Sequence, residues 1–122
     1  MLTFEDVSHS YPDGPDRITA LSHIHLTVSR GEFVAVMGPS GSGKTTLVNL
    51  AAGIEPPENG RVALGAVDVG RASARQRAKL RRRQIGVVHQ EDELDPVLTA
   101  VENVALPRLR RGAAGGRRSR PR

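Results

Sequence analysis

The chain has 122 residues, the size of one ordinary domain, and its 38% hydrophobic and 25% charged residues are typical of a globular protein in water. It has no cysteine, which excludes disulfides and thiolate metal sites, and no apolar run near the about 18 to 20 residues that a membrane-spanning helix needs. Seven arginines after residue 107 account for the net charge of +5, because residues 1–107 hold 11 basic against 13 acidic side chains. Acidic Glu5 and Asp6 follow Met1 in place of a signal sequence, so we expect a cytoplasmic protein.

The first two elements are predicted to be half-solvated antiparallel strands. Leu2, Phe4 and Val7 alternate with polar residues, and the first strand is expected to end in a loop near residues 11–15, which hold two prolines and a glycine. Alternation between apolar and polar side chains also runs through residues 18–28, and a turn is expected at Arg30 and Gly31.

The pattern changes at residues 33–37, where five apolar side chains follow one another without a polar face. Such a run suits a strand that helices cover on both sides, so we predict a strand of a central sheet here. Glycines and serines fill residues 38–43. Helix-forming residues then run from Lys44 to Ala52, and Gly53 with the following proline pair is expected to end that helix.

The next segment is predicted to contain a second small β region and a basic helix. Asn59 and Gly60 form a tight-turn signal ahead of an apolar alternation through residues 62–69. Ser73 and Gln76 have the spacing of a capping box, which predicts a helix start there and a helix that runs to about Arg83.

Three further segments complete the predicted order. Residues 85–88 are a candidate buried strand, residues 98–106 are predicted to be helical, and Pro107 is expected to close that helix. Residues 108–122 contain only arginine, glycine, alanine, serine, proline and one leucine. They hold too little apolar surface to offset the entropy of ordering, so we expect a disordered tail.

Residues 38–45 carry the chemistry, because they match the spacing G-x-x-x-x-G-K-[ST] between a predicted strand and a predicted helix. Glycines let successive backbone N–H groups converge on phosphate oxygens at the positive end of a helix. Lys44 would lie between the β- and γ-phosphates, the Thr45 hydroxyl would bind Mg²⁺, and the Thr46 hydroxyl would reach the α-phosphate. The predicted nucleotide-binding residues of this loop are Gly38, Ser40, Gly41, Ser42, Gly43, Lys44, Thr45 and Thr46.

Around this loop the sequence resembles the ATP-binding subunits of ABC transporters. Tyr11 precedes the loop where that family carries an aromatic residue that stacks on adenine, residues 31–47 are close to the family's consensus, and Gln90 follows a short predicted strand as the family's Q-loop glutamine does. The stretches most similar to the lipoprotein-releasing and macrolide-export branch are residues 73–75, 81–90 and 98–107. The resemblance covers residues 1–107.

The resemblance implies a fold, two cofactors and two partners. The expected fold is α/β, an incomplete P-loop NTPase core with an N-terminal antiparallel β subdomain. ATP and Mg²⁺ are the expected cofactors, with Tyr11 on the adenine ring and Gln90 joining Thr45 on Mg²⁺. The expected partners are a transmembrane permease, through the loop after Gln90, and a second ATP-binding subunit; such a protein lies at the inner face of the cell membrane.

This sequence also departs from the family's pattern. His89, Asp92 and Asp95 replace residues that are usually aromatic or apolar, which weakens the predicted docking to a permease. After Gln90 the chain carries no signature motif, no strand ending in Asp-Glu and no switch histidine. We therefore expect ATP binding without hydrolysis in these 122 residues, and we favour a fragment or frameshift product with an out-of-frame tail over a genuine shortened binder.

Other classes of function fit the residues less well. A dinucleotide-binding loop would need a third glycine where Thr46 stands. A nucleic-acid binder could use the arginines of the tail, but no aromatic residue lies among them, and we expect no nucleic-acid partner. The antiparallel strands ahead of the loop disfavour a P-loop kinase, and the basic helix is interpreted as a solvated face.

Overall fold

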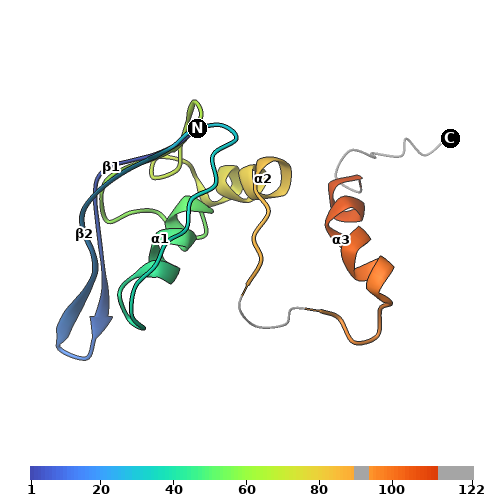
Figure 1. Ribbon diagram of the computed structural model, residues 1–122, viewed down its shortest axis with the longest axis horizontal. Coiled ribbons are helices and arrows are strands. Elements are labelled where there is room, and N and C mark those ends of the chain that lie inside the picture. The colour runs from blue at the N-terminus through green and yellow to red at the C-terminus, as the bar shows by residue number, and fades with distance from the viewer. Residues whose placement is uncertain (90–93, 113–122) are drawn as a thin grey trace, which may run out of the picture. The chain divides into compact units, whose positions relative to one another are not determined.

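A computed structural model describes residues 1–89 and 94–112 of the chain (Figure 1). The chain divides into two compact units, Met1–Ala78 and Lys79–Arg122. The first unit holds a four-stranded sheet in the order β2-β1-β3-β4, formed by β1 (Leu2–Asp13), β2 (Asp16–Val28), β3 (Asn59–Leu64) and β4 (Val67–Asp68). In the described part of the chain, no helix has the length and hydropathy that crossing a bilayer requires.

Strands β1 and β2 form the predicted antiparallel hairpin (Figure 1). Their register pairs Leu2 with Val28 and Asp13 with Asp16, so the turn lies at residues 14–15. Phe4 and Val7 of β1 are buried while most of β2 is exposed, as the alternating pattern predicted for strands with one wet face.

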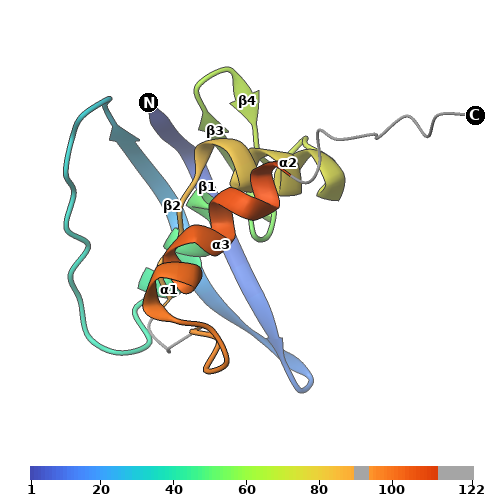
Figure 2. The ribbon, with the colours of Figure 1, turned by 90° about the vertical axis from the view of Figure 1, so that its right-hand side faces the viewer.

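The antiparallel strands β3 and β4 confirm the second β region, but the prediction of a tight turn at Asn59 and Gly60 is wrong (Figure 2). Asn59 pairs with Ser8 at the start of β3, and the turn between β3 and β4 lies at residues 65–66. Gly60 has a φ of 81°, and a Cβ there would lie 2.2 Å from the backbone oxygen of Asp6. The glycine is needed because β1 approaches closely, which sequence alone does not reveal.

The predicted central strand at residues 33–37 is not formed. Figure 2 shows this part of the chain as coil between the end of β2 and α1 (Lys44–Ala51). Phe33 and Met37 are 93% and 88% exposed. A strand needs a neighbour to accept its ladder hydrogen bonds, and among the described residues none pairs with this segment.

The predicted buried strand at residues 85–88 is likewise absent. These residues have no regular structure, and Val88 is 97% exposed. Residues 33–37 and 85–88 are both apolar runs, but the described sheet offers neither of them a partner strand.

Helix α1 confirms the prediction for the residues after the glycine-rich loop. Ala52 is its C-cap residue, and Gly53 has the left-handed φ of 63° that commonly ends a helix. Helix α2 (Ala74–Gln84) begins at the predicted capping box, because the Ser73 N–H donates to Gln76 Oε1 at 2.7 Å and the Gln76 N–H donates to Ser73 Oγ at 3.2 Å.

Helix α3 (Ala100–Gly112), in the second unit, differs from its prediction at both ends. It begins after Thr99, whose hydroxyl and backbone N–H bond with Glu102 in a second capping box that the sequence analysis missed. It continues through Pro107, which has no N–H to donate to the carbonyl of Asn103. Residues 108–112 of the predicted disordered tail are therefore helical, and residues 113–122 lie outside the described residues.

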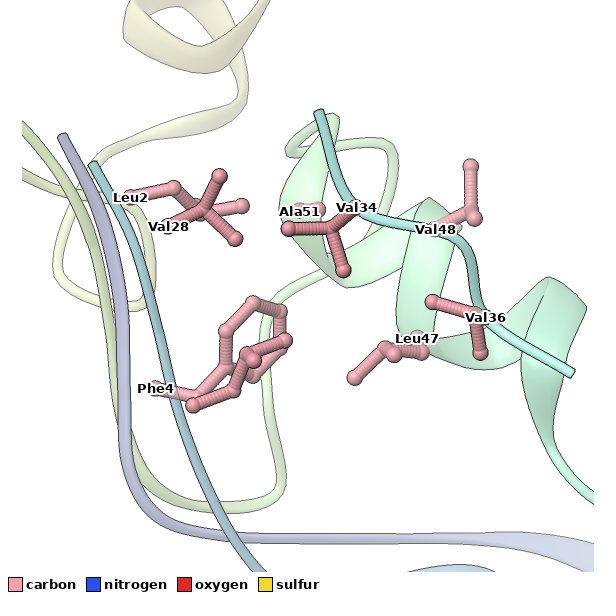
Figure 3. Close-up of a pocket in the computed structure, with 9 residues that line it drawn as sticks. Leu2, Phe4, Val28, Val34, Val36, Leu47, Val48 and Ala51 are labelled. Atoms are coloured by element: carbon pink, nitrogen blue, oxygen red, sulfur yellow. The ribbon is translucent and has the colours of Figure 1, made fainter. Parts of the chain in front are cut away.

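A pocket of about 220 Å³ lies between the sheet and α1 (Figure 3). Figure 3 shows Phe4 and Leu47 pointing into this space from the sheet and the helix. The lining is wholly apolar and consists of Leu2, Phe4, Leu26, Val28, Val34, Val36, Leu47, Val48 and Ala51. The pocket thus belongs to the hydrophobic contact that holds α1, and the loop before it, against β1 and β2.

Candidate nucleotide-binding site

The glycine-rich loop turns sharply into α1. Gly41 has a φ of 79° and Gly43 a φ of 86°, both in the left-handed region that favours glycine. Gly43 is the N-cap residue of α1, and a Cβ on it would lie 2.3 Å from the backbone oxygen of Ala20 in β2. A Cβ on Gly38 would lie 2.7 Å from Ser42 Oγ, so the loop closes tightly on itself.

Lys44 crosses the loop that precedes it. Its Nζ donates to the carbonyl oxygens of Gly38 at 2.8 Å and Pro39 at 2.5 Å, and Ser42 Oγ lies 3.3 Å away. The two carbonyl bonds fix the ammonium group across the loop, and its third N–H contacts only the Ser42 hydroxyl, which can rotate. A negatively charged oxygen at that point would be bound by a charge-assisted hydrogen bond.

The start of α1 supplies the other half of an anion site. No side chain among the described residues caps this helix end, and its first turn holds no acidic residue. The backbone N–H groups of a first helical turn have no partner within the helix, and the helix dipole makes that end positive. Loop, lysine and helix end therefore fit a polyphosphate by their own geometry.

The threonines after Lys44 occupy different environments. Thr45 is exposed at the start of α1, where its hydroxyl oxygen is a suitable ligand for a hard cation such as Mg²⁺. Thr46 is only 7% exposed, and its side chain acts to lower the pKa of Tyr11. Ser40 is exposed in the loop. The predicted contact of Thr46 with an α-phosphate stays a prediction.

The structure brings Tyr11, at the end of β1, next to α1. Its hydroxyl donates to Glu55 Oε1 at 2.6 Å, and its ring forms a T-shaped pair with that of His9, with ring centroids 4.9 Å apart and planes at 76°. Burial raises the pKa of Tyr11 above its ordinary value of 10.0, and the hydrogen bond to Glu55 raises it further. Sequence reasoning found Tyr11 but missed Glu55, which lies 44 positions further along and has no local signal.

The second predicted Mg²⁺ ligand, Gln90, lies outside the described residues. Within residues 1–89 and 94–112, no group of three or more His, Asp or Glu side chains is arranged to hold a metal ion. Mg²⁺ commonly keeps several waters and takes few protein ligands alongside substrate phosphates, so a single threonine hydroxyl is compatible with its usual coordination.

A tight glycine loop, a lysine that spans it and an uncapped helix start define a P-loop, the phosphate-binding motif of many nucleotide-binding proteins. The family model described as ABC transporter matches residues 21–120. The chain belongs to the ABC transporter family. The match extends beyond residue 107, where the sequence analysis expected the resemblance to end.

Curated relatives agree with this family. The lipoprotein-releasing system ATP-binding protein LolD of Legionella pneumophila (strain Paris) is 41% identical over 114 residues, which are 93% of this chain and 50% of that protein. The uncharacterized ABC transporter ATP-binding protein MJ0796 of Methanocaldococcus jannaschii is 39% identical over 124 residues, which are 100% of this chain and 53% of that protein. The macrolide export ATP-binding/permease protein MacB of Vibrio parahaemolyticus is 39% identical, with 92% of this chain and 17% of that protein covered.

The fold agrees as well. A dimeric structure of the ATP-binding cassette MJ0796, in a post-hydrolysis state bound to ADP and Pi, superposes with a TM-score of 0.85 and 36% identity. The superposition covers 99% of this chain and 50% of that one. The predicted α/β P-loop fold with an N-terminal antiparallel β subdomain is confirmed, and the chain spans about half the length of LolD and MJ0796.

Proposed function

We propose that this chain binds Mg-ATP at the loop formed by residues 38–45, as the nucleotide-binding part of an ABC transporter subunit of the lipoprotein-releasing or export type. The bonds from Lys44 Nζ to the carbonyls of Gly38 and Pro39 carry the proposal, because they hold the ammonium across the glycine-rich loop that leads into an uncapped helix. The names of the relatives, which are ATP-binding proteins of such systems, support it.

Each residue has a separate task in this proposal. The backbone N–H groups from Gly41 to Thr45 and the Lys44 ammonium bind the β- and γ-phosphate oxygens. The Thr45 hydroxyl and Gln90 bind Mg²⁺, which neutralises phosphate charge when it is present. Tyr11 offers its ring to the adenine base, a contact that needs no base-specific hydrogen bond.

The same proposal assigns partners from the family. A permease would dock on the loop after Gln90, and a second ATP-binding subunit would face the nucleotide, placing the protein at the cytoplasmic face of a membrane. The dimeric cassette among the similar structures supports the second partner. We infer ATP binding without turnover for these 122 residues, because no apolar run in their sequence leads directly into an Asp-Glu pair.

Replacing the loop lysine tests the nucleotide site. Lys44→Ala removes a charge-assisted bond to phosphate, and since such a bond contributes about 2–3 kcal/mol, we expect Mg-ATP affinity to fall on the order of 100-fold in equilibrium dialysis. Lys79, in α2, is the chain's other lysine, so Lys79→Ala is a matched control that should leave the affinity unchanged. Equal affinities in the wild type and Lys44→Ala would remove the loop from the site.

A further inference from the structure

The hydroxyl of Tyr11 is anchored by a carboxylate that comes from the segment after α1. Glu55 Oε1 accepts the Tyr11 hydroxyl at 2.6 Å, and the Glu55 side chain keeps 26% of its surface exposed. The same oxygen lies 3.4 Å from Asn49 Nδ2, a donor on α1. One carboxylate therefore joins the end of β1 to the helix that starts at the phosphate loop.

The second oxygen of Glu55 completes the arrangement. Glu55 Oε2 lies 3.6 Å from His9 Nε2, and His9 in turn packs against the ring of Tyr11. The His9 side chain is only 11% exposed, and its Nδ1 is buried without a hydrogen-bond partner among the described residues. The tyrosine ring is thus held at its hydroxyl by Glu55 and at its side by His9.

A ring fixed at two points has lost its rotational freedom before any ligand arrives. Stacking on a base requires one orientation of the ring, and a side chain ordered in advance loses less entropy on binding. Asn49, on the helix that follows the phosphate loop, donates to the same Glu55 oxygen and so ties this arrangement to that helix. The orientation of the ring is therefore set relative to the place where the phosphates would bind.

We propose that Glu55 is a positioning residue of the nucleotide site, which holds the Tyr11 ring in the orientation that stacks on the base. The inference rests on the proposed function, because it assigns to Tyr11 the adenine contact. It adds a residue that touches neither phosphate nor base and that acts only through Tyr11.

Two ligands separate positioning from folding. Mg-ATP engages both the ring and the loop, whereas Mg-tripolyphosphate engages the loop alone. In Glu55→Ala we expect affinity for Mg-ATP to fall about fivefold to tenfold, because the released ring must then be ordered when the base binds, while affinity for Mg-tripolyphosphate is unchanged. Glu55→Gln keeps an oxygen that can accept the tyrosine hydroxyl and should restore most of the ATP affinity.

The neighbouring Glu58 provides the matched control. It accepts hydrogen bonds from Arg17 Nη2 at 2.7 Å and from the Ser10 N–H at 3.1 Å, so Glu58→Ala removes a carboxylate of the same region that does not bond to Tyr11. We expect Glu58→Ala to bind both ligands as the wild type does. Tyr11→Phe should reproduce the loss in Glu55→Ala, and the double variant should lose nothing further, because both changes break one bond.

A spectroscopic measurement detects the hydrogen bond between Tyr11 and Glu55 without any ligand. The chain has one tyrosine and no tryptophan, so its ultraviolet absorbance at alkaline pH reports the ionisation of Tyr11 alone. Removing the carboxylate in Glu55→Ala should lower the pKa of Tyr11, since the hydrogen bond to Glu55 raises it in the wild type. Glu58→Ala should leave the titration unchanged.

The outcomes distinguish this inference from the proposed function. Equal losses for both ligands in Glu55→Ala would show a structural role and overturn the inference, as would an unchanged ATP affinity. A wild-type chain that fails to bind tripolyphosphate would overturn the proposed function itself and the inference with it. If tripolyphosphate binding is retained but Tyr11→Phe and Glu55→Ala differ in their affinity for Mg-ATP, the inference alone is overturned.

Discussion

At the scale of single residues, the glycines of the phosphate loop serve different purposes. Gly41 and Gly43 both have left-handed backbone angles, but a Cβ on Gly41 would meet nothing within 4 Å. A Cβ on Gly43 would collide with the backbone of Ala20 in β2 and crowd Leu21. Gly41 is thus required by the turn alone, whereas Gly43 is also required by the packing of the loop against the sheet.

This difference predicts unequal costs for two alanine substitutions. Gly41→Ala should lower the free energy of unfolding by about 1–2 kcal/mol, the cost of a left-handed angle for an L-residue. Gly43→Ala should lower the free energy of unfolding by more than about 3 kcal/mol, because the added Cβ has the same backbone strain and also clashes with the backbone of Ala20. Urea denaturation of both variants measures the difference, and equal losses would mean that β2 moves aside freely.

At the scale of elements, Arg61 on β3 joins its two neighbouring strands. Its Nη1 lies 3.2 Å from Glu5 Oε1 on β1, and its Nε donates to Asp68 Oδ2 on β4 at 3.1 Å. The Arg71 N–H also donates to Asp68 Oδ1 at 3.1 Å. Burial pushes the pKa of Asp68 upward, but the bonds from Arg71 and Arg61 outweigh it and leave the pKa below the ordinary value of 3.8.

The lowered pKa of Asp68 predicts a pH-dependent contribution to stability. A carboxylate with a lowered pKa in the folded state contributes fully above its unfolded value of 3.8, and this contribution is lost as the pH falls through the folded value. Asp68→Asn should therefore cost about 0.5–1 kcal/mol at neutral pH and less at acidic pH. Denaturation at several pH values measures this, with exposed Asp16→Asn as the control, and a pH-independent loss would contradict the ionic account.

At the scale of the whole molecule, the apolar segment at residues 33–37 exposes large apolar side chains and has no partner strand in the described sheet. Phe33 and Met37 face solvent, while Val34 and Val36 line the pocket against α1 and the sheet (Figure 3). The backbone of this segment has no ladder partner among the described residues. Exposed apolar side chains beside a backbone without ladder partners favour association with other chains.

Substitution of the exposed ring tests this account of the surface. Phe33→Ser should reduce concentration-dependent self-association in sedimentation velocity and leave the thermal unfolding midpoint unchanged, because the side chain is 93% exposed. Phe4→Ser, at a side chain only 2% exposed, is the contrasting variant and should cost about 3–5 kcal/mol. If Phe33→Ser destabilised the chain as much as Phe4→Ser, the ring would have a buried partner in solution.

The local elements could be predicted from the sequence because their causes lie within a few residues. The β1–β2 hairpin follows from alternation and a proline-glycine turn, α2 starts at the reciprocal bonds of Ser73 and Gln76, and α1 ends at Gly53. The loop at residues 38–45 was recognisable because its motif needs a particular backbone shape and a lysine at one position.

The tertiary structure alone decided what depends on distant parts of the chain. Residues 33–37 and 85–88 remain coil because an apolar run becomes a strand only beside a partner, which the described sheet does not provide. Gly60 serves a close approach to β1, and Glu55 binds Tyr11 across 44 positions. Sequence by itself determined the glycine-rich loop and its lysine, while the fold decided which side chains surround Tyr11, since hydrogen bonds between remote residues form only once β1 and α1 have packed together.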